Sequence, residues 1–176
     1  MALLLSYAQY RKLQKGEAVL REGERCRRFF FVERGYLRTY FTKEGHTTNL
    51  RFALEGTFAT NIKSFRNQTP SETTLEAGEA SEVWILHLRR LLEQGNVPPQ
   101  IARFVRRLYL DSLLASEAHS DMLRLSDASQ RYHYLEAHHP ELLQRIPLLQ
   151  LASYLGLTRE TLSRIRARPS ASAPRL

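Results

Sequence analysis

Three charged side chains within six residues could read the edges of DNA bases: Arg159, Glu160 and Arg164. An arginine can donate two hydrogen bonds to one guanine, and a glutamate can accept from the amino group of cytosine. These residues follow a helix break at Gly156, and Thr158 stands where a hydroxyl could cap a new helix. The pattern favours a sequence-specific DNA-binding protein. The competing interpretation is a helix pair with an ordinary solvated charged face.

The surrounding residues predict a helix-turn-helix. The helix before the turn would carry one apolar face, formed by Leu148, Leu151, Ala152 and Leu155. The helix after the turn would bury Leu162 and Ile165 and expose its charged residues. In this motif the N-terminal residues of the second helix enter the major groove of DNA.

Composition and charge agree with a polyanionic partner. The 176 residues suit one large domain or two small ones, and 43% hydrophobic content is enough for a buried core. The net charge is +8. Half of it comes from residue 141 onward, where the sequence has six arginines and two glutamates. The first residues do not resemble a signal peptide, and no apolar stretch is long enough to span a membrane.

The single cysteine, Cys26, excludes an intrachain disulfide and a cysteine-ligated zinc or iron–sulfur site within one chain. Together with the absence of a signal peptide, this suits a reducing compartment, and we expect a cytoplasmic protein with no membrane partner.

Residues 11–96 predict short antiparallel strands. Glycines recur every 7 to 12 residues, at Gly16, Gly23, Gly35, Gly45 and Gly56. Aromatic and β-branched runs lie between them at 29–32 and 36–41, and a late buried strand is predicted at 83–86. Turn signals at this spacing indicate a β-sandwich or barrel.

The spacing of the apolar residues becomes helical after Pro98 and Pro99, which favour a helix start. One stripe of the following helix consists of Ile101, Val105, Leu108, Ser112, Ala115, His119 and Met122. A second apolar stripe consists of Leu110, Leu113 and Leu114. Two stripes favour a helix between two surfaces, one of them a partner subunit; the alternative is a helix packed wholly within one monomer. Residues 126–139 predict another helix, capped by Ser126 or Asp127.

These parts, in this order, resemble the Crp/Fnr family of bacterial transcription regulators. Residues 15–24 and 30–38 look like its β-roll strands, and residues 159–164 are similar to its recognition helix. Arg131–Tyr132, residues 140–143 and residues 152–156 resemble a Bacteroidetes-type branch of the family.

The resemblance implies an α+β fold: an N-terminal antiparallel β-roll (a double-stranded β-helix or jelly roll), a long dimerisation helix and a C-terminal winged helix-turn-helix. We therefore expect a sensor domain at 1–97, a dimerisation helix at 98–123 and a DNA-binding domain at 124–176. About a dozen residues follow the recognition helix, too few for the wing hairpin. The partners would be double-stranded DNA, a second copy of the chain through helix 98–123, and RNA polymerase as a further candidate.

By the same resemblance, Arg159 and Arg164 would each bond a guanine and Glu160 would accept from a cytosine. A palindrome of half-sites related to TGTGA would follow. The residues expected to contact DNA phosphates are Thr158, Thr161, Ser163, Arg166 and Arg168.

The sensor half departs from the cyclic-nucleotide binders of the family. Their phosphate-binding cassette has a Gly-Glu pair and an arginine shortly after a proline; here Ala59-Thr60 and Ser71-Glu72 stand at those places. A buried phosphate needs a charged partner or several backbone donors, so we expect no binding of cyclic AMP or cyclic GMP. Lys63 and Arg66 lie nearby but do not match the pattern. The degenerate effector pocket would consist of Phe58, Ala59, Thr60, Asn61, Ser71, Glu72 and Thr73, open to a small-molecule effector of another kind.

Two other functions compete with this one. Metal-dependent catalysis in a small β-barrel needs several converging histidines, and the β-region has only His46 and His87. No nucleophile elbow, phosphate loop or HExxH motif occurs, so we expect no enzyme, no catalytic residue and no metal ligand. The third function is an effector-responsive interaction module that does not bind specific DNA.

Overall fold

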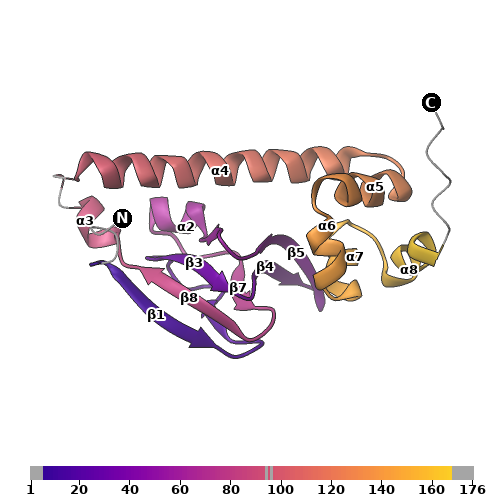
Figure 1. Cartoon of the computed structure of the whole chain (residues 1–176), viewed down its shortest axis with the longest axis horizontal. Helices are drawn as coiled ribbons and strands as arrows, with labels where there is room; N and C mark the ends of the chain where they lie inside the picture. Colours follow the sequence, from indigo (N-terminus) through magenta and orange to yellow (C-terminus); the bar gives the residue numbers. More distant parts are fainter. Residues whose placement is uncertain (1–5, 94, 96, 168–176) are drawn as a thin grey trace. The chain divides into compact units, whose positions relative to one another are not determined.

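The computed structural model describes residues 6–93, 95 and 97–167 (Figure 1). The chain divides into two compact units, residues 1–114 and 115–176. The helix α4 (Pro99–Arg124) contributes its first part to one unit and its last part to the other. The boundaries expected at residues 97 and 123 stay a prediction.

The first unit is built on two four-stranded sheets with antiparallel pairing throughout. The first sheet has the order β1 (Ala8–Leu13), β8 (Ser81–Leu86), β3 (Phe29–Arg34) and β6 (Phe58–Ala59). The second has the order β2 (Ala18–Leu20), β7 (Thr74–Ala77), β4 (Leu37–Lys43) and β5 (His46–Ala53). The antiparallel strands that the glycine spacing predicted are therefore confirmed, and so is the β-roll that the family resemblance implied.

The core of this unit forms where the two sheets face each other. Strand β3 shows the pattern, since Phe29, Phe30 and Val32 are buried while its last two residues are exposed. Gly35 follows directly with φ +86°. A Cβ at this position would lie 2.3 Å from the Ser81 hydroxyl, so only glycine lets the chain turn here against β8.

An aromatic row crosses the first sheet at one register level. Tyr10 is paired with Trp84, Trp84 with Phe31, and Phe31 with Phe58 across β1, β8, β3 and β6. The rings of Tyr10 and Trp84 are 5.3 Å apart, and those of Phe31 and Phe58 are 5.0 Å apart. Phe104 of α4 extends the row, 5.3 Å from Phe58. Edge-to-face and tilted pairs of this kind stabilise a sheet beyond the area they bury.

Three helices formed by described residues complete the first unit. The sequence did not predict α2 (Ile62–Asn67) or α3 (Arg89–Glu93) within the stretch assigned to strands. The first part of α4 buries Ile101, Val105 and Leu108 in the β-roll core, as its first stripe predicted.

In its described part, up to residue 167, the second unit combines the end of α4 with four short helices: α5 (Ala128–His138), α6 (Pro140–Arg145), α7 (Leu148–Tyr154) and α8 (Arg159–Ala167). Asp127 caps α5 by accepting from the Ser129 amide, which decides between the two expected caps. The buried core of the unit consists of Met122, Leu135, Leu142, Leu143, Ile146, Leu151, Ala152, Leu155 and Leu162. None of the helices formed by described residues is both long and apolar enough to cross a membrane.

Candidate functional site

The turn between α7 and α8 is set by hydrogen bonds at the end of α7. Gly156 has φ +64°, the left-handed conformation expected of a residue just past a helix end. The Leu157 amide donates to the Ala152 carbonyl at 2.9 Å, and the Gly156 amide donates to the Ser153 carbonyl at 3.2 Å. This pair of bonds satisfies carbonyls that the helix end would otherwise leave open, and it fixes the direction in which α8 departs.

Arg131 of α5 supports the same turn. Its Nη1 donates to the Leu155 carbonyl at 3.2 Å and its Nε donates to the Leu125 carbonyl at 2.8 Å. A Cβ on Gly156 would lie 3.1 Å from that Nη1. Sequence reasoning gave Arg131 no structural role, because its partners lie 6 and 24 residues away.

The start of α8 is capped as its sequence predicts. Thr158 Oγ1 accepts from the Thr161 amide at 3.2 Å and donates to the Thr161 hydroxyl at 3.0 Å. Leu162 is fully buried and anchors the helix to the core of the second unit, while Ile165 is half-buried. The first turn of α8 is thus fixed by the Thr158 cap at its start and by buried Leu162 one turn further on.

The three candidate base-reading residues, Arg159, Glu160 and Arg164, lie exposed on α8. Within the described part of the chain, the side chains of Arg159 and Glu160 form no hydrogen bond or ion pair, although they are neighbours. Arg164 lies back along its own helix, with Nε 3.4 Å from the Glu160 carbonyl and Nη2 3.5 Å from the Thr161 hydroxyl. Hydrogen bonds of this length are weak, so Arg164 can replace them by bonds to a ligand at little cost in free energy.

The residues expected to contact DNA phosphates differ in how freely their side chains can reach a phosphate. Ser163 is exposed and Thr161 is half-buried beneath its bond to Thr158. Arg166 donates from Nη2 to the Leu143 carbonyl, which ties α8 to α6 and leaves less of its guanidinium for a phosphate. Arg168 lies outside the described residues.

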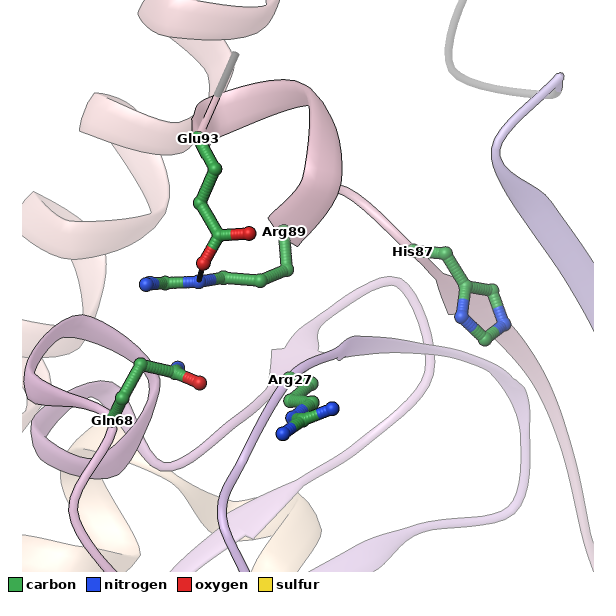
Figure 2. Close-up of a pocket in the computed structure, with 5 residues that line it drawn as sticks. All are labelled: Arg27, Gln68, His87, Arg89 and Glu93. Atoms are coloured by element: carbon green, nitrogen blue, oxygen red, sulfur yellow. Dashed lines mark hydrogen bonds and ion pairs between the residues drawn. The ribbon is translucent and has the colours of Figure 1, made fainter. Parts of the chain in front are cut away.

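Clefts lined by described residues open on the first unit, and two of them concern the candidate site. The basic cleft, about 580 Å³, is lined by Arg27, Gln68, His87, Arg89 and Glu93 (Figure 2). A second cleft of about 330 Å³ lies between the β-roll and α4, and its lining includes Phe58, Thr60, Arg51, Phe104, Arg107 and Ser112. Only Phe58 and Thr60 of the predicted effector pocket line this second cleft. Among the described residues, no three His, Cys, Asp or Glu side chains gather as a metal ion would require.

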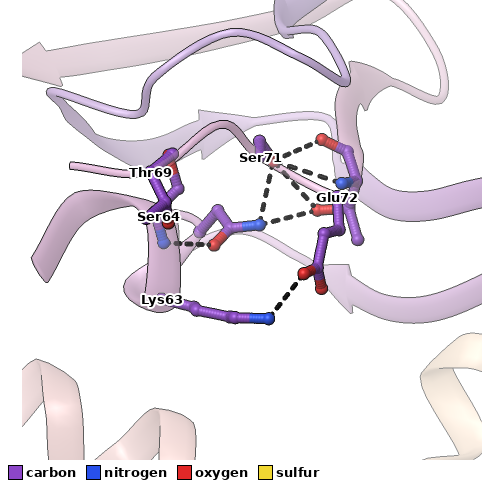
Figure 3. Close-up of polar contacts among 7 residues, drawn as sticks. Lys63, Ser64, Thr69, Ser71 and Glu72 are labelled. Carbon is purple, nitrogen blue, oxygen red and sulfur yellow. Dashed lines mark hydrogen bonds and ion pairs between the residues drawn. The ribbon is translucent and has the colours of Figure 1, made fainter. Parts of the chain in front are cut away.

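The remaining polar residues of the predicted effector pocket bond to one another. Asn61 caps α2 by accepting from the Ser64 amide at 2.9 Å, and its Nδ2 donates to the hydroxyls of Ser71 and Thr73, each at 2.9 Å. Ser71 donates in turn to the Thr73 carbonyl at 2.6 Å. Figure 3 shows Ser71 at the centre of these contacts. The side-chain donors of Asn61 and Ser71 therefore already have partners.

Two charged residues beside this network, Lys63 and Glu72, pair with each other. Glu72 is exposed and forms an ion pair with Lys63 at 2.5 Å (Figure 3). On the other side, the Thr60 hydroxyl donates to the Arg28 carbonyl at 3.0 Å and lies 3.2 Å from Cys26 Sγ. The predicted loss of the cassette's charged ligands therefore coincides with a closed local hydrogen-bond network.

The sequence and the fold of this chain are similar to those of known proteins. The cyclic nucleotide-binding domain family matches residues 10–95. FixK2 from Bradyrhizobium japonicum is 22% identical with a TM-score of 0.76, covering 91% of this chain and 83% of its own. CLP from Xanthomonas campestris, a c-di-GMP-responsive global regulator, is 18% identical with a TM-score of 0.70, covering 92% and 86%.

A transcriptional regulator of the Crp/Fnr family from Eubacterium rectale is also similar, at 17% identity and a TM-score of 0.71, covering 93% of this chain and 79% of its own. No curated protein matches the chain by sequence. The names of CLP and of the Eubacterium rectale protein describe both as regulators.

Proposed function

This chain contains a cyclic nucleotide-binding domain within the Crp/Fnr fold, and from that premise we propose that it is a homodimeric transcription regulator that binds a palindromic DNA site. Its sensor domain has lost the usual cyclic-nucleotide ligands. DNA is the partner, and α8 is the element that enters the major groove.

The observation that carries this proposal is the exposed first turn of α8. Arg159 and Glu160 stand there without partners among the described residues, on a helix fixed by Thr158 and Leu162. An unpaired guanidinium and an unpaired carboxylate side by side on a rigid helix could bond guanine and cytosine without breaking an internal contact. A purely solvated charged face would have no need of this support.

The exposed leucines of α4 support a dimer. Leu110, Leu113 and Leu114 are 50%, 55% and 61% exposed. The first part of the other stripe, Ile101, Val105 and Leu108, is buried in the β-roll, whereas these three leucines have no cover from the described residues of the first unit. Clustered exposed leucines on a long helix are typical of a subunit interface.

The closed network around Asn61 and Ser71 supports the loss of cyclic-nucleotide binding. A cyclic phosphate at this place would have to displace neutral hydrogen bonds and would gain no buried cation. We expect no saturable binding of cyclic AMP or cyclic GMP in calorimetric titration.

Selection of bound duplexes from a random DNA pool, at about 0.15 M salt, tests the main proposal. We expect a two-fold symmetric motif whose half-sites are one helical turn apart and related to TGTGA. The Arg159→Ala variant, exposed and without an internal partner, should fold normally and lose the motif.

Binding without a motif in the wild-type protein would contradict sequence-specific regulation. If binding to duplex DNA also lacked a steep salt dependence, the chain would be the interaction module instead, because docking to another protein releases no condensed counterions.

A further inference from the structure

The basic cleft lies apart from the closed cassette network and brings together four separate segments of the first unit. Arg27 comes from the loop between β2 and β3, Gln68 from the end of α2, His87 from the end of β8, and Arg89 with Glu93 from α3. Figure 2 shows the five side chains around one opening. Its volume of about 580 Å³ is in the range of small-molecule sites, about 300–1,000 Å³.

The cationic side of the cleft has unused donors. Arg27 is exposed and makes no side-chain hydrogen bond or ion pair within the described residues. Arg89 is held in place: its Nε pairs with Glu93 at 2.6 Å and its Nη1 donates to the Phe65 carbonyl at 2.9 Å. The second terminal nitrogen of Arg89 has no partner among the described residues. Two guanidinium groups, one of them positioned, are suited to a phosphate.

The cleft also offers acceptors. Gln68 donates from Nε2 to the carbonyls of Phe65 and Cys26, at 2.8 and 3.3 Å. Its amide oxygen is then directed toward the opening (Figure 2). Glu93 supplies a carboxylate beside Arg89. A bare anion would meet these oxygens unfavourably, whereas a ligand with hydroxyl groups could donate to them.

Gln68 holds a strained backbone at this place. Its φ of +54° is left-handed, a conformation that costs a residue with a Cβ about 1–2 kcal/mol. The two bonds of its amide to backbone carbonyls hold the side chain there. Strained backbone that the surroundings fix is more frequent at binding sites than elsewhere.

His87 adds a neutral group. Burial lowers its pKa and the nearby Arg28 lowers it further, so the ring is uncharged at neutral pH and offers one donor and one acceptor.

We propose that the basic cleft binds a phosphorylated polyhydroxy compound, with the phosphate on Arg27 and Arg89 and the hydroxyl groups on Gln68 and Glu93. The site stands independently of DNA binding, because none of its residues belongs to α8.

Calorimetric titration of the full chain with glucose 6-phosphate, inorganic phosphate and glucose tests the proposal. We expect saturable binding of glucose 6-phosphate, at least about tenfold tighter than that of inorganic phosphate, and no measurable binding of glucose. Equal affinity for the two phosphates, or no saturable binding of glucose 6-phosphate, would overturn the proposal.

The matched variants are Arg27→Gln in the cleft and Arg21→Gln, an exposed arginine on the same loop outside it. Arg27→Gln should weaken glucose 6-phosphate binding at least about tenfold, and Arg21→Gln should leave it unchanged. Equal weakening by both variants would mean attraction by general positive charge and would refute a specific site. Circular dichroism of each variant checks its fold.

Discussion

The imidazole ring of His119 stacks on the phenol ring of Tyr154, with the ring centroids 4.1 Å apart and the planes inclined by 9°. The same ring donates from Nε2 to the Tyr154 carbonyl oxygen at 2.9 Å. One side chain of α4 thus holds both the ring and the backbone of the last residue of α7. Since α7 ends at the turn into α8, His119 links α4 to the helix-turn-helix.

The second unit should lose stability in mild acid. Burial lowers the pKa of His119, and its hydrogen bond to the Tyr154 carbonyl opposes this effect only in part. The unfolded chain therefore takes up the proton more readily than the folded one. Stability is complete above the ordinary histidine pKa of about 6.5 and falls as the pH drops through that value toward the folded pKa. Chemical denaturation followed at a series of pH values measures this decrease.

Two histidine variants separate this effect from general acid sensitivity. His119→Gln should flatten the pH dependence, while His46→Gln, at an exposed position of β5, should leave it as in the wild-type protein. The lowered pKa of His87 acts in the same direction but belongs to the first unit and is unchanged in both variants. A pH profile of His119→Gln identical to that of the wild-type protein would refute the assignment.

Glu160→Ala should relax DNA specificity at a single base pair. Its carboxylate is exposed and unpaired within the described chain, so the substitution removes a base contact without disturbing the fold. We expect the preference at one position of each half-site to fall by about 1–3 kcal/mol, with other positions unchanged. Competition binding with a set of single-base operator variants measures this. Glu136→Ala, an exposed carboxylate on α5, is the control and should change no preference.

Gly156→Ala should destabilise the second unit by about 1–2 kcal/mol or more, because a left-handed backbone is unfavourable for alanine. The new Cβ would also press on Arg131 Nη1 at 3.1 Å. Gly45→Ala is the matched control: φ is +79° there, and no atom lies within 4 Å of the added Cβ. Thermal unfolding of both variants should show a smaller loss for Gly45→Ala, and equal losses would mean that the contact with Arg131 contributes nothing.

Leu113→Gln combined with Leu114→Gln should weaken dimerisation at least about tenfold, because each substitution removes an apolar side chain from the proposed interface. Sedimentation velocity over a range of concentrations measures the shift to monomer, and affinity for a palindromic site should fall with it. Leu149→Gln is the control, because that leucine on α7 is 66% exposed but lies outside the α4 stripe. A monomeric wild-type protein would contradict the dimer itself.

The sequence predicted those elements that depend on interactions between residues close together in the chain. Gly156 and Thr158 mark the turn because a left-handed backbone and a capping hydroxyl are short-range requirements. The glycine spacing indicated antiparallel strands joined by turns for the same reason, and the β-roll itself followed only from the family resemblance. The short helix α2 was missed because the strand pattern around it dominated, although Asn61 is a suitable cap.

The residues that position the candidate sites were not predictable. His119 reaches Tyr154 over 35 residues and Arg131 reaches Leu155 over 24, and no periodic pattern marks such pairs. The basic cleft is assembled from four segments, and its residues share no motif. These contacts join residues that tertiary packing brings together, so they can be identified only from the folded structure.

The aromatic row of the first sheet includes Trp84, the single tryptophan of the chain, whose indole nitrogen donates to the Glu33 carboxylate. Tryptophan emission therefore reports on the β-roll alone, while the helices of both units contribute to circular dichroism. The native protein thus carries an intrinsic optical probe for one of its two units. Comparing the two signals during denaturation would reveal whether the units unfold together or in sequence, without labelling or truncating the chain.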